Sequence, residues 1–211
     1  TLPLAALTPL LSSSAGPEMY RLFLGNVSAL SAGDLPSALF SCAPQGAGQT
    51  RWLAGRALLS HAVSPLPEII YSEQGKPAFS AGTPLWFNLS HSNDDIALLL
   101  SDEGEVGCDI EVVRQRDNWR ALVSAVFSPG EQAEIEATPP ERQIAAFWRI
   151  WTRKEAIIKQ YGGSAWQMRS IDSTQPSALS VSQIQIGSLS LAVCTPTPFL
   201  LTTANISRVR S

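Results

Sequence analysis

Hydrophobic and polar positions in the first half of the chain predict one helix among several strands. Apolar residues recur at helical spacing within Arg51–Val63, and two prolines close behind it end that helix. Residues 28–50 are rich in Gly, Pro, Ser and Gln, so we expect irregular structure there. Strand patterns occupy the ranges Tyr20–Gly25, Glu68–Tyr71, Leu85–Leu89, Ile96–Leu100 and Val106–Glu111. The last two of these strands flank a short turn and are expected to pair as a β-hairpin.

The second half begins with an arginine-rich segment and continues with two predicted helix starts. Ser128-Pro-Gly-Glu131 and Thr138-Pro-Pro-Glu141 each place a hydroxyl at the N-cap, proline next and glutamate three residues on. The second start opens a long helix that runs to about Tyr161, where two glycines end it. Three strand patterns follow, at Leu179–Ile186, Ser188–Cys194 and Phe199–Thr203. The first two are expected to form a hairpin.

Each half of the chain therefore combines a helix with an antiparallel hairpin, which predicts an α+β protein of two lobes. We place the N-terminal lobe at residues 19–113 and the C-terminal lobe at residues 114–211. Residues 1–18 contain no Lys or Arg, so they lack the basic start of a secretory signal. We interpret them as a flexible or added extension ahead of a natural start at Met19, with a processed N-terminus as the rival interpretation.

Composition narrows the class of protein further. Among 211 residues, 45% are hydrophobic and 16% are charged, as in an ordinary globular protein. The net charge of −3 gives no sign of a broad nucleic-acid surface, and no run of about 18 apolar residues predicts a membrane span. The cysteines Cys42, Cys108 and Cys194 form no C-x-x-C pair, which favours reduced thiols and a cytoplasmic location.

Two acids stand out in the strand predicted over Val106–Glu111. Side chains alternate across a strand, so Asp109 and Glu111 point to the same face. Two neighbouring carboxylates repel each other unless a positive charge lies between them, and a hard cation such as Mg²⁺ prefers oxygen ligands. The spacing alone fits either a cation site or two solvated acids at a strand end.

The long helix carries a second candidate group. Trp151, Glu155 and Lys159 recur every four residues and share one helical face. The Glu and Lys could form an ordinary surface ion pair. Alternatively, Glu155 could supply a third carboxylate to a cation site, and Lys159 could meet a phosphate as a point charge.

Taken together, these segments resemble the ordered motifs of the Sfp-type 4′-phosphopantetheinyl transferases. The matching motifs are Gly75–Pro77, Asn88–Ser92 (N-L-S-H-S), Gly107–Glu111 (G-C-D-I-E), Phe127–Glu131 (F-S-P-G-E) and Trp151–Lys159 (W-T-R-K-E-A-I-I-K). The resemblance covers about Arg51 to Ser173. Within the family, the sequence is most similar to the enterobacterial AcpT branch of holo-acyl-carrier-protein synthases. It implies a pseudo-two-fold fold of two similar lobes, each with an antiparallel sheet and a long helix, and an active site at their interface.

The resemblance also implies a reaction. A monomeric enzyme would move the 4′-phosphopantetheine arm of coenzyme A to a serine of an acidic apo acyl carrier protein, leaving adenosine 3′,5′-bisphosphate. The ion would be Mg²⁺, with Mn²⁺ as an alternative, held by Asp109, Glu111 and Glu155. Lys159 would bind phosphate and stabilise the transferring group, and Glu155 or Glu111 would accept the serine proton. The implied coenzyme A contacts are Arg51, Arg56, Lys76, Ser90, His91 and Lys159.

Structural explanations stand beside these roles. His91 could be a structural histidine, a capping box already accounts for Glu131, and Trp151 could be a core residue. Lys154 is expected to make a surface or interlobe contact. The docking surface for a carrier protein is predicted at Arg114, Arg116, Trp119, Arg120, Leu122 and Val123, unless the apolar members are simply core residues.

One departure from the family pattern qualifies the resemblance. Many relatives carry basic residues just before the first helix, whereas residues 38–50 contain none. Phosphate contacts would then depend on Arg51, Arg56, Lys76 and His91. A degenerate relative that binds coenzyme A or a carrier with little transfer is therefore the alternative hypothesis.

Overall fold

The computed structural model describes residues 19–33 and 35–210 and has a mixed α+β architecture. The interpretation of residues 1–18 lies outside the described residues. The helices are α2 (Val27–Ser31), α3 (Ser37–Cys42), α4 (Gln49–Ala62), α5 (Trp119–Val126), α6 (Pro129–Glu136) and α7 (Gln143–Gln160). The strands are β1 (Tyr20–Asn26), β2 (Ile69–Tyr71), β3 (Pro77–Phe79), β4 (Trp86–Ser92), β5 (Asp95–Ser101), β6 (Gly107–Val112), β7 (Ser180–Ile186), β8 (Leu189–Thr195) and β9 (Ile206–Arg208).

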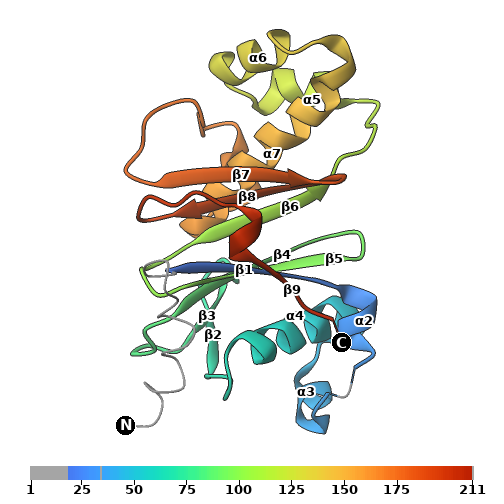
Figure 1. Cartoon of the computed structure of the whole chain (residues 1–211), viewed down its shortest axis with the longest axis vertical. Coiled ribbons are helices and arrows are strands. Elements are labelled where there is room, and N and C mark those ends of the chain that lie inside the picture. The colour runs from blue at the N-terminus through green and yellow to red at the C-terminus, as the bar shows by residue number, and fades with distance from the viewer. Residues whose placement is uncertain (1–18, 34, 211) are drawn as a thin grey trace.

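Two larger sheets face each other at the centre of the molecule (Figure 1). The first has the strand order β4-β5-β1-β9 and is covered on its outer side by α4. The second has the order β6-β8-β7 and is covered by α7, beyond which α5 and α6 lie. Leu22, Leu99, Ile110 and Leu191 are buried between the two sheets, where they form a shared apolar core. The predicted α+β class is confirmed.

The expected hairpin of Ile96–Leu100 with Val106–Glu111 is wrong. Strand β5 pairs with β1 and β4, whereas β6 pairs antiparallel with β8. Both sheets therefore combine strands from the two sides of residue 113, because β9 also returns to lie parallel to β1. The lobe boundary at residue 113 stays a prediction.

Some of the other predicted helices, strands and helix caps are present and some are not. The helices expected over Arg51–Val63 and up to Tyr161 are present as α4 and α7, and the β7–β8 hairpin is confirmed. Residues 28–50 are not irregular throughout, because α2, α3 and the start of α4 lie there. The capping box at Ser128 is present, but Thr138 does not cap α7, which begins at Gln143 after a 3₁₀ turn. The last strand is β9, not Phe199–Thr203.

Gly107 of β6 packs directly against the backbone of α7. A Cβ atom at this position would lie 2.1 Å from the Ala156 carbonyl oxygen and 2.4 Å from the Gln160 nitrogen. Both are backbone atoms of a helix, so neither can move aside without distorting α7. The glycine of the G-x-D-x-E pattern therefore allows direct contact with the helix that carries Glu155 and Lys159.

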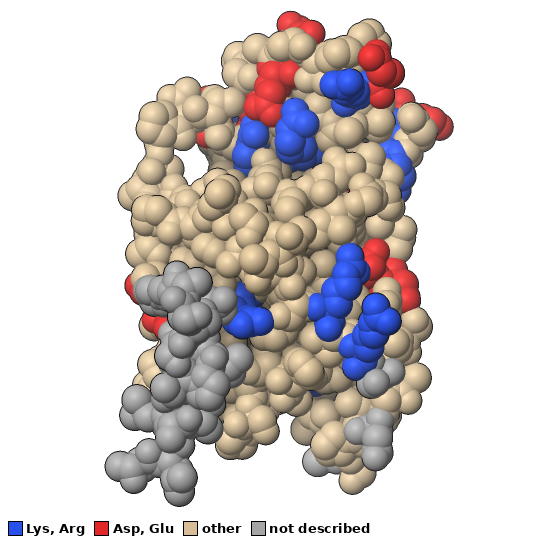
Figure 2. Space-filling model, viewed as in Figure 1, with Lys and Arg blue, Asp and Glu red and all other residues tan. Residues whose placement is uncertain are grey.

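The visible surface carries interspersed charges. Figure 2 shows basic and acidic side chains scattered among uncharged ones on this face, with no broad basic surface. Cys42, Cys108 and Cys194 are all free, as their spacing predicts. None of the helices in residues 19–33 and 35–210 combines the length and apolar character needed to cross a bilayer.

Candidate active site

Strands β4 and β6 lie edge to edge, and polar side chains join them. The Oδ1 atom of Asn88 accepts a hydrogen bond from the Cys108 amide at 2.8 Å, and the hydroxyl of Ser90 accepts one from Ile110 at 3.0 Å. Ser92 accepts a third, from the Val112 amide at 3.1 Å. Backbone amides at a strand edge need partners when they are buried. This polar ladder of Asn88, Ser90 and Ser92 therefore holds β6, with its two acids, against the first sheet.

Asp109 is the most deeply buried acid of the candidate site, with a side chain 10% exposed. Its Oδ1 atom accepts a hydrogen bond from Ser90 at 3.0 Å and lies 3.8 Å from the Lys159 ammonium. Its Oδ2 atom is buried and accepts no hydrogen bond from any residue that the structure describes. Burial raises the pKa of Asp109 to about 8; Lys159 opposes the rise, while Glu155 and Glu111 add to it. A buried carboxylate with a free oxygen and two acidic neighbours is short of positive charge.

Glu111 lies at the more exposed end of the same strand. Its Oε2 atom is 2.9 Å from Arg114, whose guanidinium also donates to the Val112 carbonyl. The Arg114 guanidinium stacks 4.1 Å from the centre of the Trp148 ring. Arg114 is thus a counter-ion of Glu111. The sequence analysis placed Arg114 on a docking surface and did not predict this ion pair.

Glu155 and Lys159 project from α7 toward these acids. Burial raises the pKa of Glu155, Lys159 lowers it, and Glu111 adds a further rise. The Lys159 ammonium donates to the Leu89 carbonyl at 2.9 Å, which holds it beside Asp109. The predicted helical face therefore does meet the predicted strand face.

The three carboxylates are nevertheless not assembled into a closed cluster. Within the part of the chain that the structure describes, no three His, Cys, Asp or Glu side chains are grouped closely enough to hold a metal ion. Lys159 and Arg114 provide counter-charges to Asp109 and Glu111. The joint holding of an ion by Asp109, Glu111 and Glu155 stays a prediction. The donor set still fits a hard cation, since Asp109 keeps an unpartnered buried oxygen.

His91 points away from the ladder and lies beside Arg51. Arg51 Nη1 and His91 Nε2 are 2.6 Å apart. Arginine can only donate, so Nε2 accepts and the imidazole is neutral with its proton on Nδ1. Burial lowers the pKa of His91, and the charges of Arg51 and Lys159 lower it further. Two cations and a neutral imidazole thus share one polar surface next to the acids.

Arg56 lies apart from this surface. It is 7% exposed, donates to the Tyr71 hydroxyl and stacks 4.6 Å from the centre of the Trp52 ring. These contacts account for Arg56 as part of the packing of α4 against β2. Its coenzyme A contact stays a prediction.

Lys76 uses all three of its ammonium protons within the protein. Nζ donates to Glu105 Oε2 at 2.9 Å and to the carbonyls of Val106 and Gln160 at 3.0 Å each. Gln160 is the last residue of α7, where a cation favours the helix dipole. Lys76 therefore anchors the end of α7, and its contact with a nucleotide also stays a prediction.

Lys154 is not at the surface, contrary to the expectation of a surface or interlobe contact. Its side chain and that of Glu131 are both 0% exposed, with 2.7 Å between Nζ and Oε1. Lys154 also donates to the carbonyls of Val126 and Ile171 at 2.7 Å each. It turns inward because Glu131, which caps α6, offers a carboxylate inside the core.

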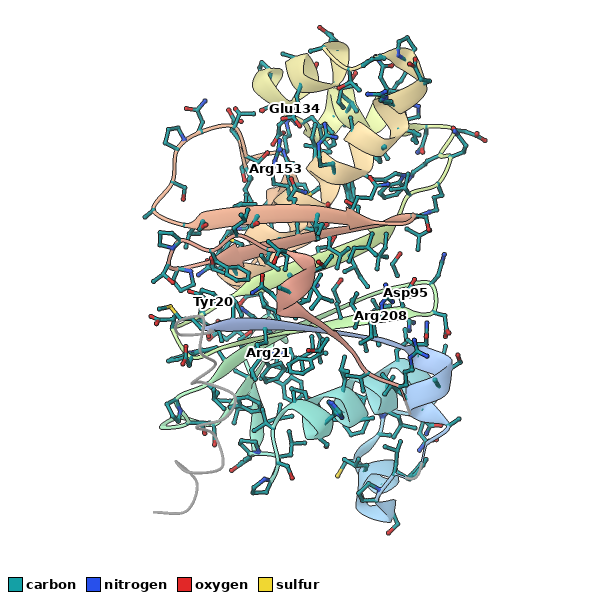
Figure 3. The ribbon with its side chains drawn as sticks, viewed as in Figure 1. Tyr20, Arg21, Asp95, Glu134, Arg153 and Arg208 are labelled. Atoms are coloured by element: carbon teal, nitrogen blue, oxygen red, sulfur yellow. The ribbon has the colours of Figure 1, made fainter. Side chains whose placement is uncertain are left out.

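A more exposed pair lies near by. Figure 3 shows Glu134 of α6 close to Arg153 of α7, and their charged groups are 2.9 Å apart. The buried pair and this one both link α6 to α7, the helix that presents Glu155.

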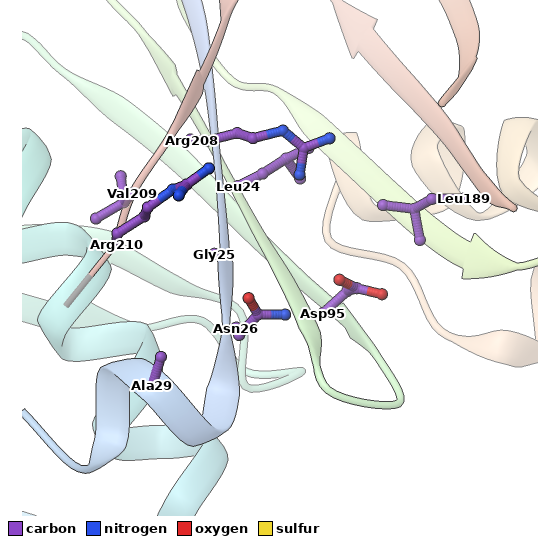
Figure 4. A pocket seen from close by; sticks show the side chains of 9 residues that line it. All are labelled: Leu24, Gly25, Asn26, Ala29, Asp95, Leu189, Arg208, Val209 and Arg210. Carbon is purple, nitrogen blue, oxygen red and sulfur yellow. The ribbon is translucent and has the colours of Figure 1, made fainter. Parts of the chain in front are cut away.

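A separate pocket of about 360 Å³ opens between β1, β9 and the start of β8 (Figure 4). Asp95, Arg208 and Arg210 contribute its charged side chains. Burial and the charge of Asp94 raise the pKa of Asp95, while Arg208 lowers it. None of the predicted site residues lines this pocket.

The sequence analysis did not predict that Asn88 and Ser92 join β4 to β6, as Ser90 does. The signal was available in the alternation of Asn88, Ser90 and Ser92, which a strand places on one side. It also missed the pairing of Glu131 with Lys154, for which residue spacing offers no signal because the two lie on different helices.

Comparison with known proteins gives one consistent result. The sequence model of the 4′-phosphopantetheinyl transferase superfamily matches residues 105–205. The chain is 74% identical over 190 residues to 4′-phosphopantetheinyl transferase AcpT of Salmonella typhi, covering 90% of this chain and 99% of the relative. It is 67% identical over 193 residues to AcpT of Escherichia coli K12, covering 92% and 99%. A 4′-phosphopantetheinyl transferase of Bacillus subtilis is 34% identical over 90 residues, covering 43% and 39%.

Proposed function

Because the chain belongs to the 4′-phosphopantetheinyl transferase superfamily, we propose that it moves the 4′-phosphopantetheine arm of coenzyme A to a serine of an apo acyl carrier protein. The serine oxygen forms a bond to the phosphorus on the pantetheine side of the pyrophosphate. The bond from that phosphorus to the oxygen of adenosine 3′,5′-bisphosphate breaks, and the serine proton passes to a carboxylate. The active site lies between β4, β6 and α7.

The observation that carries this proposal is the environment of Asp109. Its buried Oδ2 atom is without a hydrogen-bond donor among the described residues, and burial together with two acidic neighbours raises its pKa to about 8. A divalent cation would supply the missing charge. Asp109, Glu111 and Glu155 would hold Mg²⁺, which when bound supplies positive charge to the pyrophosphate oxygens.

The other residues act by position and charge, which phosphoryl transfer chiefly requires. Lys159 lies beside Asp109 and would offset charge on the transferring phosphoryl group. Arg51 and His91 form the adjoining polar surface, which suits the phosphates of coenzyme A. Glu155 or Glu111 would accept the serine proton, since both lie within the same group of charges.

Intact-mass measurement tests the proposal directly. The protein is incubated with coenzyme A, Mg²⁺ and a panel of apo carrier proteins. We expect a phosphopantetheine adduct on a carrier serine, and none when EDTA is present. Binding of coenzyme A without any adduct would instead support a degenerate relative, an alternative suggested by the lack of basic residues in 38–50. The monomeric state and the cytoplasmic location stay predictions.

The carrier is proposed to dock on the arginine-rich segment before and along α5. Arg116 lies 5.9 Å from the ring centres of Trp148 and Trp151, and Arg120 lies 4.4 Å from that of Trp119. Contacts of this kind between arginines and aromatic rings restrict the arginine side chains, and the positive charges suit an acidic partner.

Reversing the charges at this surface should slow carrier modification. We expect Arg116→Glu with Arg120→Glu to lower kcat/KM for an acidic carrier by about 10-fold or more, since like charges oppose association. Coenzyme A affinity, measured by calorimetry, should stay unchanged. The matched control is Arg208→Glu with Arg210→Glu, which alters net charge equally at exposed positions beyond the docking segment. Equal kinetics for the two double variants would refute this docking surface.

A further inference from the structure

Two hydroxyls of β4 make the same pair of contacts with β6. Ser90 Oγ accepts from the Ile110 amide at 3.0 Å and donates to Asp109 Oδ1 at 3.0 Å. Ser92 Oγ accepts from the Val112 amide at 3.1 Å and donates to Glu111 Oε2 at 3.4 Å. Each serine thus contacts one acid of β6 and the backbone amide of the residue that follows that acid.

Asn88 makes only half of this pair of contacts. Its Oδ1 atom accepts from the Cys108 amide at 2.8 Å, but the residue before Cys108 is Gly107, which has no side chain. Asn88 therefore joins the strands without contacting an acid. The alternation Asn88, Ser90, Ser92 on β4 matches the alternation of glycine and the two acids on β6.

The hydroxyl of Ser90 is fully committed to these contacts. A serine has one proton to donate, and here it lies between Oγ and Asp109 Oδ1. Ser90 is only 5% exposed, whereas its neighbour His91 is on the exposed side of the strand. The hydrogen bond fixes one oxygen of Asp109 and leaves the other, Oδ2, without a donor among the described residues.

From this geometry we infer that Ser90 is a positioning residue, which holds the Asp109 carboxylate so that Oδ2 stays available to a divalent cation. The inference rests on the proposed function and deepens it. It gives Ser90 a role through Asp109, and it leaves direct contact with coenzyme A phosphates to the outward-facing pair Arg51 and His91.

The first test measures the binding of Mn²⁺ alone by electron paramagnetic resonance. Removal of a side chain that hydrogen-bonds a metal ligand typically weakens metal binding about 10- to 100-fold, so Ser90→Ala should raise the Mn²⁺ dissociation constant by about 10-fold or more. Ser90→Thr keeps the hydroxyl and should stay close to the unaltered protein. Asn88→Ala loses one bond between the strands and should lower the melting temperature without changing Mn²⁺ affinity.

The second test separates positioning from substrate contact. Ser90→Ala should raise the Mg²⁺ concentration needed for half-maximal transfer and leave the KM for coenzyme A unchanged. A raised KM for coenzyme A with unaltered Mn²⁺ affinity would overturn the inference. Absence of Mn²⁺ binding and of transfer by the unaltered protein would overturn the proposed function itself. Should Ser90→Ala fail to fold, Ser90→Cys is measured by the same criteria, because a thiol keeps the volume but donates weakly.

Discussion

Replacing Asp109 by asparagine is expected to lower the rate of phosphopantetheine transfer by about 10³-fold or more. The amide has the shape of the carboxylate and can still accept the hydrogen bond from Ser90. It carries no negative charge, however, so it should bind a divalent cation much more weakly and cannot hold Lys159 by charge. The measurement is the initial rate of adduct formation on an apo carrier at saturating coenzyme A.

The same replacement should not lower the melting temperature in buffer with EDTA. Burial, Glu155 and Glu111 together outweigh the favourable charge of Lys159, since the net effect raises the pKa of Asp109 to about 8. Asparagine does not ionise, so it avoids the cost of burying or neutralising this carboxyl on folding, and we expect stability to be equal or higher.

Asp102→Asn is the matched control for this experiment. Asp102 also has a buried oxygen without a donor among the described residues, and burial raises its pKa, but it lies in the turn after β5. We expect it to keep full transfer activity. Activity within tenfold of the unaltered protein in Asp109→Asn would contradict the proposed role of this carboxylate.

Replacing Glu131 by alanine is expected to reduce the free energy of unfolding by about 3–5 kcal/mol. The change leaves the Lys154 ammonium buried with only the carbonyls of Val126 and Ile171 as partners. It also removes the acceptor of two hydrogen bonds from Ser173. Urea unfolding followed by circular dichroism measures the loss.

Two further variants decide whether the buried charge is the cause. Glu134→Ala breaks the partly exposed pairs of α6 with Arg149 and Arg153 and should cost no more than about 1 kcal/mol. Glu131→Leu combined with Lys154→Met removes both charges and should recover most of the stability. Equal losses in Glu131→Ala and Glu134→Ala would show that burial of the ion pair is not what matters.

The pH dependence of the Glu131→Ala effect follows from the pKa of Glu131. Burial acts to raise this pKa, but hydrogen bonds from Lys154 and Ser173 outweigh it, so the net pKa lies below the usual 4.5. The carboxylate therefore stabilises the fold fully above about pH 4.5, and that stabilisation is lost as the pH falls through the lowered value. The difference between the unaltered protein and Glu131→Ala should accordingly shrink in acid.

Local patterns in the sequence were sufficient for the elements that carry the site. Helical spacing in α4 and α7, and the turn at Gly187, act over a few residues, so a short window contains the whole signal. Helices α2 and α3 were missed because five and six residues are too few to show a helical period.

Strand pairing was harder to predict from the sequence, because strands that are neighbours along the chain need not pair in the sheet. The partner of β6 is β8, beginning 77 residues after β6 ends, from Val112 to Leu189. The alternating pattern of β6 says only which residues share a face. Similarly, the inward turn of Lys154 depends on Glu131 of another helix, and Ser90 contacts Asp109 across two strand edges. Such contacts exist only in three dimensions.

Strand β9 also constrains the order of events during synthesis. Residues 206–208 lie parallel to β1 and form the edge of a sheet whose other strands are complete by residue 101. The nascent N-terminal half can therefore leave the ribosome with that edge uncovered, and the sheet reaches its full width only after residue 208 has been translated. Pairing of β6 with β8 has the same late timing. Neither sheet can therefore be completed before the segments that follow residue 189 have been translated.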